Sequence, residues 1–275
     1  MEIFHSFSEM FSSKHYIQNE IVFVPTMGNI HDGHISLVKE GKKYSTNILL
    51  SIYLNEEQFN DRRDFENYPR TKEEDLQKLE DTGVKYVILP EKQEIYNLSS
   101  PFNKNLEPKF LTKVLCGKNR PGHFTAVMDI VGRFFQIVEP TYAIFGEKDY
   151  QQLLVIKELV KLCGYNPKII HSEPVRDHNG LVLSSRNSNL SDAEKVQAMK
   201  IYESLLHAKD LYSKKKDLTV IIKEIFAFFS SCNNIDLEYF DILNANTLRD
   251  RIGNDLIALL AVRIGKVRLI DNIRF

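Results

Sequence analysis

Short apolar runs alternate with helix-like segments through the first 178 residues of the chain. Five runs rich in Val, Ile, Leu, Tyr and Phe are candidate strands: Ile21–Thr26, Asn47–Asn55, Tyr86–Pro90, Tyr142–Gly146 and Lys168–Val175. They are largely apolar throughout rather than alternating in polarity, which is typical of parallel strands buried on both faces. The alternation therefore predicts an α/β fold whose mostly parallel sheet has helices on both faces.

The segments between these runs have the spacing of amphipathic helices. Apolar side chains from Val127 to Val138 recur three or four residues apart, which places them on one face of a helix over Thr125–Val138. Thr71 and Glu74 have the spacing of a capping box, and Gly83 follows as a stop signal, so a helix is predicted over Thr71–Gly83.

The pattern changes after the polar stretch Arg176–Gly180. Ser191 and Glu194 form a second predicted capping box at the start of a helix that ends near Tyr212. A further helix and three strand-like runs follow: Leu218–Ser230, then Leu237–Leu243, Leu256–Ile264 and Val267–Ile270. We therefore expect two domains, residues 1–178 and a smaller α+β domain of residues 179–275.

The charge balance excludes some classes of protein. Lys and Arg total 36 against 37 for Asp and Glu, so the chain lacks the basic excess typical of nucleic-acid binders. No apolar run approaches the roughly 18 residues of a membrane span. The N-terminus does not resemble a secretory signal, and the three cysteines are widely spaced. These features predict a cytoplasmic protein without nucleic-acid or membrane partners.

The sharpest local signal is the segment PTMGNIHDGH, from Pro25 to His34. It follows a predicted strand and leads into a helical pattern, the usual position for ligands in open α/β sheets. A glycine-containing turn at a helix N-terminus suits phosphate, because backbone N–H groups point outward there. His31 and His34 can add two donors beside a phosphoryl group.

Two other interpretations of the histidine pair remain open. A His-x-x-His pair can bind a metal, although no third and fourth ligand with zinc-like spacing is evident, and we assign no metal site. The pair can also be two polar residues of a surface loop. The segment is neither a Walker loop nor a GxGxxG fingerprint.

Three further polar clusters lie at the ends of predicted strands. They begin at Asn55, Gly146 and Arg176 and include amide, ammonium, hydroxyl and guanidinium groups. Two of them have a plain structural explanation: Lys148 with Asp149 is a charge pair at a helix start, and Ser184 with Ser185 forms a turn or a helix cap. Together they can bind a triphosphate and a small carboxylic acid, with catalysis by positioning and charge stabilisation.

Five motifs, in order along almost the whole chain, resemble those of the pantoate–β-alanine ligases of the HxGH nucleotidyltransferase superfamily. PTMGNIHDGH is similar to the signature PTMGxLHxGH, and NEEQFNDRRDFENYPRT to NPxQFxxxEDxxxYPRT. GKNRPGHF, FGEKDYQQL and RDHNGLVLSSRNSNLS are the other three of the five, and the final VRLIDN also resembles a family segment. The resemblance implies a Rossmann-like nucleotide-binding domain, a smaller lid-like C-terminal domain with the site near their join, and a homodimer.

The resemblance also implies a reaction in two steps. ATP and pantoate would give a pantoyl adenylate and pyrophosphate, and β-alanine would then release pantothenate and AMP. His34 would be the proton donor, with His31, Lys148, Ser184, Ser185 and Arg186 as further catalytic groups. Gln58 and Gln152 would bind pantoate, Gln58 also β-alanine, and Asn55 would support them.

The motif positions further imply which residues would contact ATP. They would be Met27, Gly28, Asn29, Ile30, His31, Asp32, Gly33, His34, Gly146, Glu147, Lys148, Asp149, Val175, Leu183, Ser184, Ser185 and Arg186. Mg²⁺ is expected with ATP, since it offsets the phosphate charge. Glu74 and Asp75 match positions where the family carries acidic residues near the metal, but a role at the helix start explains them equally well.

Three positions depart from the family pattern: Asn29 replaces alanine, Glu56 replaces proline and Leu183 replaces methionine. None of them removes a group assigned to chemistry. Another HxGH nucleotidyltransferase and a nucleotide-sensing module without turnover remain alternative functions. A tRNA-charging enzyme is a weaker third, because no RNA-binding extension or basic surface is apparent.

Overall fold

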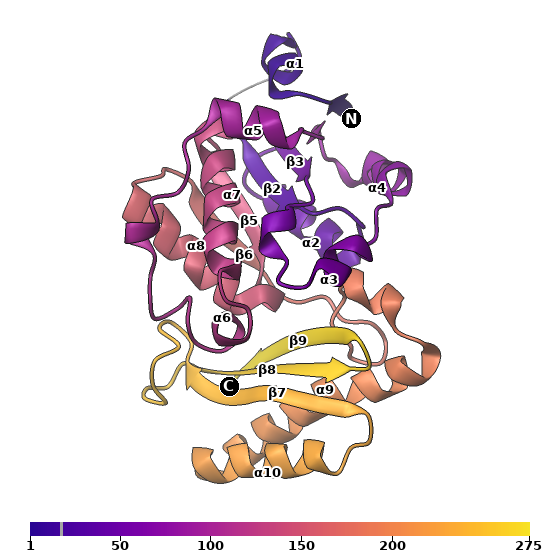
Figure 1. The fold of residues 1–275 in the computed structure, drawn as a ribbon, viewed down its shortest axis with the longest axis vertical. Helices are drawn as coiled ribbons and strands as arrows, with labels where there is room; N and C mark the ends of the chain where they lie inside the picture. Colours follow the sequence, from indigo (N-terminus) through magenta and orange to yellow (C-terminus); the bar gives the residue numbers. More distant parts are fainter. Residues whose placement is uncertain (17–18) are drawn as a thin grey trace. The chain divides into compact units, whose positions relative to one another are not determined.

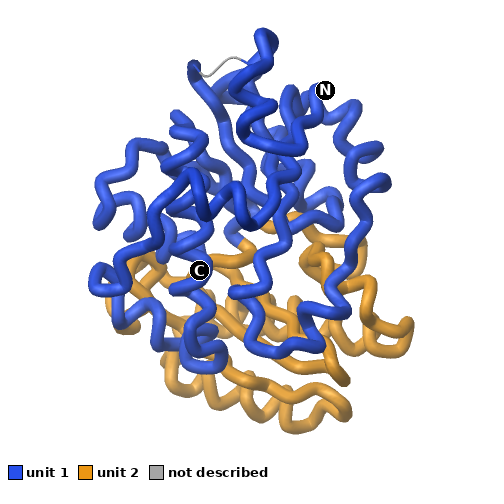
Figure 2. Tube along the Cα trace, turned by 45° about the horizontal axis from the view of Figure 1, so that its top comes forward, with its two compact units in different colours: residues 1–147, 152–173 blue, residues 148–151, 174–275 orange. Residues whose placement is uncertain are grey.

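The computed structural model describes residues 1–16 and 19–275 and divides the chain into two compact units. The first unit comprises residues 1–147 and 152–173, and the second comprises residues 148–151 and 174–275 (Figure 2). The polypeptide therefore enters the second unit briefly at residues 148–151 before it leaves the first unit at residue 173.

A parallel sheet forms the centre of the first unit (Figure 1). Among the described residues it has six strands: β1 (Glu2–Phe4), β2 (Val22–Thr26), β3 (Ile48–Ile52), β4 (Tyr86–Ile88), β5 (Tyr142–Gly146) and β6 (Lys168–Ser172). Their spatial order is β1-β4-β3-β2-β5-β6, and every neighbouring pair is parallel. The predicted α/β class is confirmed.

Helices cover both faces of this sheet. Successive residues of a strand point to opposite sides, so neighbours in β2 pack against different helices. Val22 and Val24 pack with Leu37 of α2 on one face. Phe23, between them, contacts Phe134 of α7, with 5.4 Å between the ring centroids. The helices that lie wholly in the first unit are α1 (Phe7–Ser12), α2 (Asp32–Gly41), α3 (Arg62–Glu66), α4 (Lys72–Leu79), α5 (Lys92–Leu98), α6 (Cys116–Asn119) and α7 (His123–Val138). The next helix, α8 (Tyr150–Cys163), starts with two residues of the second unit and continues in the first.

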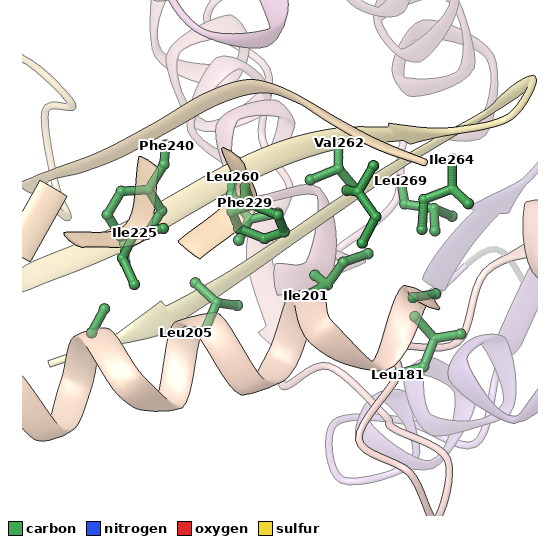
Figure 3. Packing of buried hydrophobic residues seen from close by; sticks show 14 of the residues in the cluster. Leu181, Ile201, Leu205, Ile225, Phe229, Phe240, Leu260, Val262, Ile264 and Leu269 are labelled. Atoms are coloured by element: carbon green, nitrogen blue, oxygen red, sulfur yellow. The ribbon is translucent and has the colours of Figure 1, made fainter. Parts of the chain in front are cut away.

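The second unit, described in full, combines two long helices with an antiparallel sheet of three strands. Its elements are α9 (Asp192–Ser213), α10 (Leu218–Ser230), β7 (Ile235–Asn244), β8 (Leu256–Ile264) and β9 (Val267–Arg274). In Figure 3, Ile201 and Leu205 point from α9 toward Leu260 and Val262 of β8, and all four side chains are buried. The predicted α+β character of this region is confirmed.

The two predicted capping boxes had different outcomes. At α9, Ser191 Oγ accepts from the Glu194 amide at 3.4 Å and Glu194 Oε2 accepts from the Ser191 amide at 2.8 Å, so that prediction is confirmed. At α4 the prediction was wrong, because Thr71 makes no side-chain cap. Its hydroxyl instead donates to Asp75 Oδ1 at 3.0 Å, a contact that orients the Asp75 carboxylate.

Candidate active site

The strand order places one polar segment at the centre of the sheet. From β2 the chain proceeds to β3 and β4 on one side, whereas β5 and β6 lie on the other side. This reversal between β2 and β5 is the topological switch point at which open α/β sheets bind ligands. The loop Met27–His31 leaves β2 there, and α2 packs against β2, β5 and β6.

The loop after β2 turns through two consecutive residues with left-handed backbone. Gly28 has φ of 82° and Asn29 has φ of 51°. Asparagine adopts this conformation more readily than alanine does, which gives the departure at Asn29 a physical reason. Ile30 is fully buried and anchors the loop in the apolar core beneath α2.

Replacing Gly28 by alanine is expected to destabilise the fold. A Cβ at Gly28 would lie 3.1 Å from Asp75 Oδ2 and 3.1 Å from Ile52 Cγ2, in addition to the strained φ. We expect the free energy of unfolding to fall by about 1–3 kcal/mol in urea titrations. Gly164→Ala is the matched control, since Gly164 also has positive φ but no atom within 4 Å of the added Cβ. If both variants lost the same free energy of unfolding, the contacts of the added Cβ at Gly28 would have no destabilising effect.

Backbone hydrogen bonds orient both histidines at the start of α2. His31 is the N-cap residue, and its Nδ1 accepts from the Gly33 amide at 3.1 Å. His34 Nδ1 accepts from the His31 amide at 3.4 Å, which closes a capping box. Because each Nδ1 accepts a hydrogen bond, the proton of each neutral ring is on Nε2. The rings lie 4.1 Å apart, so two Nε2–H donors are presented from one helix end.

The loop after β3 carries Asn55 and Gln58. Asn55 is the N-cap of a short 3₁₀ turn, η1 (Glu56–Gln58), and is 2% exposed. Its Oδ1 has no hydrogen-bond partner among the described residues. The Gln58 carbonyl is held twice, by Arg120 Nη2 at 3.0 Å and by His123 Nδ1 at 2.9 Å. Arg120 and His123 therefore fix the backbone from which the Gln58 side chain projects.

Arg120 and His123 were not among the predicted site residues, although the GKNRPGHF segment contains both. Nη1 of Arg120 lies 3.0 Å from His123 Nε2. The Nδ1–H of His123 donates to the Gln58 carbonyl, so Nε2 accepts from the guanidinium. The sequence shows the motif but not what Arg120 does, because the carbonyl that it contacts, that of Gln58, is 62 residues away along the chain.

The segment after β5 belongs to both units. Gly146 ends β5, and Glu147 Oε1 lies 2.6 Å from Nδ1 of His171 in the first unit. Lys148 and Asp149 belong to the second unit, where Lys148 Nζ lies 3.6 Å from Asp149 Oδ2. The charge pair at a helix start is therefore present, since both residues lie in the 3₁₀ turn η4 (Glu147–Asp149) that leads into α8. Gln152, in the first turn of α8, is counted with the first unit.

The serine segment lies in the second unit at the start of the 3₁₀ helix η5 (Ser185–Asn189). Its approach is ordered by a hydrogen bond from the Leu183 amide to the Val175 carbonyl at 2.9 Å. Ser184 Oγ accepts from the Arg186 amide at 3.3 Å, so the capping interpretation of Ser184 is correct. Ser185 is buried, and η5 packs on β9.

Two further observations concern metals and membranes. Within residues 1–16 and 19–275, no group of three or more His, Cys, Asp or Glu side chains is arranged to hold a metal ion. None of the helices in the described ranges has the length and apolar character required to cross a membrane.

Comparison with known proteins assigns these motifs to one family. Residues 2–274 match the family profile "Pantoate-beta-alanine ligase". A protein named pantothenate synthetase from Thermosipho melanesiensis is 39% identical over 256 residues, which cover 92% of this chain and 91% of the relative. The chain belongs to the pantoate–β-alanine ligase family. It is therefore an enzyme of this ligase family, as the motif resemblance predicted.

Solved structures of pantoate–β-alanine ligases have the same fold. A pantothenate synthetase from Thermus thermophilus aligns over 99% of both chains with a TM-score of 0.91 and 30% identity. The ligase from Francisella tularensis, solved in complex with beta-gamma ATP and beta-alanine, aligns over 100% of this chain and 97% of its own, with a TM-score of 0.81 and 35% identity. The parallel sheet with its switch-point loop is thus the architecture of this family.

Proposed function

We propose that the enzyme condenses (R)-pantoate with β-alanine to pantothenate through a pantoyl adenylate, using ATP. The supporting observation is the start of α2, where the two histidines present Nε2–H donors at the switch point of the sheet in a member of this ligase family. The ATP and β-alanine bound by the Francisella tularensis relative are two of the three substrates that this reaction requires.

In the first step, a pantoate carboxylate oxygen would attack the α-phosphorus of ATP. The bond between the α-phosphorus and the bridging oxygen breaks, and pyrophosphate leaves. The Nε2–H groups of His31 and His34 would donate to phosphate oxygens as these gain negative charge. In the second step the β-alanine amino group would attack the acyl carbon, AMP would leave and the amine would lose a proton. Activation is required because a free carboxylate is a poor electrophile.

The proposed ATP contacts are those that the motif resemblance implies: residues 27–34, Gly146, Glu147, Lys148, Asp149, Val175 and residues 183–186. Lys148 and Arg186 supply cations, and the Ser184 and Ser185 hydroxyls supply donors. Mg²⁺ would enter as MgATP, with the phosphates as its main ligands, and would offset their charge. We also expect the homodimer that the family resemblance implies.

Gln58, Gln152 and Asn55 are the proposed polar contacts for the other substrates. Amides of Gln58 and Gln152 would hydrogen-bond pantoate, and Gln58 would also contact β-alanine. Asn55 is buried, whereas Gln58 and Gln152 are partly exposed. A site that hydrogen-bonds its substrate discriminates well, since a ligand that lacks the matching group leaves the amides unpaired.

A single assay separates this function from its alternatives. The protein is mixed with ATP, Mg²⁺, pantoate and β-alanine, and AMP, pyrophosphate and pantothenate are quantified. We expect AMP and pantothenate in equal amounts, with AMP formation dependent on β-alanine. A product that retains the nucleotide would instead identify a nucleotidyltransferase, and ATP binding without turnover would identify a sensor.

Gln58→Ala is expected to weaken pantoate binding with little effect on the fold. The substitution removes only the side-chain amide, because Arg120 and His123 contact the main-chain carbonyl, which the variant keeps. We expect the KM for pantoate to rise about tenfold, the effect of about one lost hydrogen bond. Gln93→Ala, at an exposed position of α5, is the control. An unchanged KM for pantoate in Gln58→Ala would contradict the assignment.

A further inference from the structure

A buried carboxylate of α4 binds the loop that precedes the two histidines. Asp75 is 1% exposed. Its Oδ2 accepts from the Asn29 amide at 2.8 Å and its Oδ1 accepts from the Ile30 amide at 2.7 Å. Oδ1 also accepts from the Thr71 hydroxyl at 3.0 Å. Both oxygens of this carboxylate are therefore engaged by donors of the first unit.

Lys78, one turn further along α4, contacts the same loop with the opposite charge. Its Nζ donates to the Ile30 carbonyl at 3.0 Å. The amides of Asn29 and Ile30 thus donate to the Asp75 carboxylate, and the Ile30 carbonyl accepts from the Lys78 ammonium. Both side chains belong to α4. We call Asp75 and Lys78 together the α4 clamp.

The backbone conformation explains why the loop needs such a partner. Consecutive left-handed residues at Gly28 and Asn29 turn neighbouring N–H groups toward one side, an arrangement that binds anions. In this chain the anion is the Asp75 carboxylate. The amides of Asn29 and Ile30 are therefore occupied by the protein itself, and in this segment the donors left for phosphate are those at the start of α2.

We propose that the α4 clamp is a positioning device for the nucleotide-binding turn, with Asp75 its principal residue. It fixes Asn29 and Ile30 and so sets where α2 begins and where the rings of His31 and His34 lie. The expected effect of the clamp on ATP affinity rests on the proposed function, whereas its expected effect on the conformation of the loop does not. The proposal assigns Asp75 to the loop backbone rather than to a metal ion.

The test compares Asp75→Asn with Lys78→Met and with Glu73→Gln, an exposed residue of the same helix. Asparagine keeps the shape of Asp75 but presents one acceptor oxygen instead of two, and removes the charge. Amide hydrogen exchange at Asn29 and Ile30 reports on the loop, and exchange in β5 reports on the overall stability of the first unit. Calorimetric titration with ATP is run both in EDTA and with Mg²⁺.

We expect Asp75→Asn to accelerate exchange at Asn29 and Ile30 by about tenfold or more, without a comparable change in β5 of the same unit. ATP affinity should fall about tenfold whether or not Mg²⁺ is present. Lys78→Met should show the same pattern with a smaller change, of about threefold, and Glu73→Gln should match the wild type. If Asp75→Asn does not fold, Lys78→Met alone decides the test.

Two results would overturn the proposal. Unchanged exchange at Asn29 and Ile30 would show that the clamp does not hold the loop. A loss of ATP affinity that occurs only with Mg²⁺ would make Asp75 a metal ligand. If the wild-type protein bound no ATP, the proposed function would fail, but the exchange experiment would still decide whether the clamp fixes the loop.

Discussion

Replacing His34 by alanine is expected to slow pyrophosphate release from ATP and pantoate by about 10²–10³-fold. The variant removes the Nε2–H donor that would stabilise the phosphoryl group as its charge develops. His31 remains, but its neighbouring ring at 4.1 Å is lost. Single-turnover measurement of pyrophosphate isolates this step, because it needs no β-alanine.

Folding should be affected much less by this change. Loss of the contact from His34 Nδ1 to the His31 amide is expected to lower the free energy of unfolding by about 0.5–2 kcal/mol, the usual range for a helix cap. His207→Ala, at an exposed position of α9, is the control for histidine removal. Wild-type pyrophosphate release in His34→Ala would contradict the role proposed for this residue.

Arg176→Ala is expected to lower the free energy of unfolding by about 3–5 kcal/mol at pH 7. The Arg176 guanidinium binds the fully buried Asp271 side chain in a bidentate pair, with N–O distances of 2.6 and 2.9 Å. It also stacks on the Tyr202 ring at 3.9 Å and donates to the Gly180 and Asn272 carbonyls. The variant leaves a carboxylate buried without its cation, which is the source of the large effect.

The effect should depend on pH with a definite sign. Burial raises the pKa of Asp271 above its ordinary value of 3.8, although Arg176 opposes this shift. A carboxyl whose pKa is raised by folding binds its proton more tightly in the folded state, so stability declines as pH rises from 3.8 through the folded-state pKa. Without Arg176 this pKa rises further, and the loss of stability should be larger at pH 7 than at pH 4.

Urea titrations at the two pH values measure both effects. Arg263→Ala is the matched control, because the Arg263 side chain is exposed where it pairs with Glu238, and its loss should change stability by no more than about 1 kcal/mol. The double variant Arg176→Met/Asp271→Leu should be more stable than Arg176→Ala, since it removes the buried charge as well. If Arg176→Ala lowered the free energy of unfolding by less than about 1 kcal/mol, the pair of Arg176 and Asp271 would not be important for the stability of the second unit.

Local features of the sequence predicted much of this molecule. Continuous apolar runs identified β2 to β5 because strands buried on both faces admit few polar residues. The edge strand β6 was also predicted, although none of its residues is buried. β1 was missed because only two of its three residues are apolar, whereas the equally short β4 lies in the longer apolar run Tyr86–Pro90. The capping box at Ser191 was recognisable since its two partners are three residues apart. The same spacing at Thr71 misled, because Thr71 has ψ of 47° instead of the extended backbone of Ser191, and its hydroxyl donates to Asp75.

The amino-acid sequence by itself determined the α/β order of the first unit, the turn with two histidines at a helix start, and the family. These depend on residues that are neighbours along the chain or on motifs whose order is preserved. The partnerships that hold the site depended on the topology instead. Asp75 is 46 residues from Asn29, Arg120 is 62 from Gln58, and Arg176 is 95 from Asp271. No local propensity encodes such distances, because each contact forms only when the sheet order and helix packing bring the two segments together.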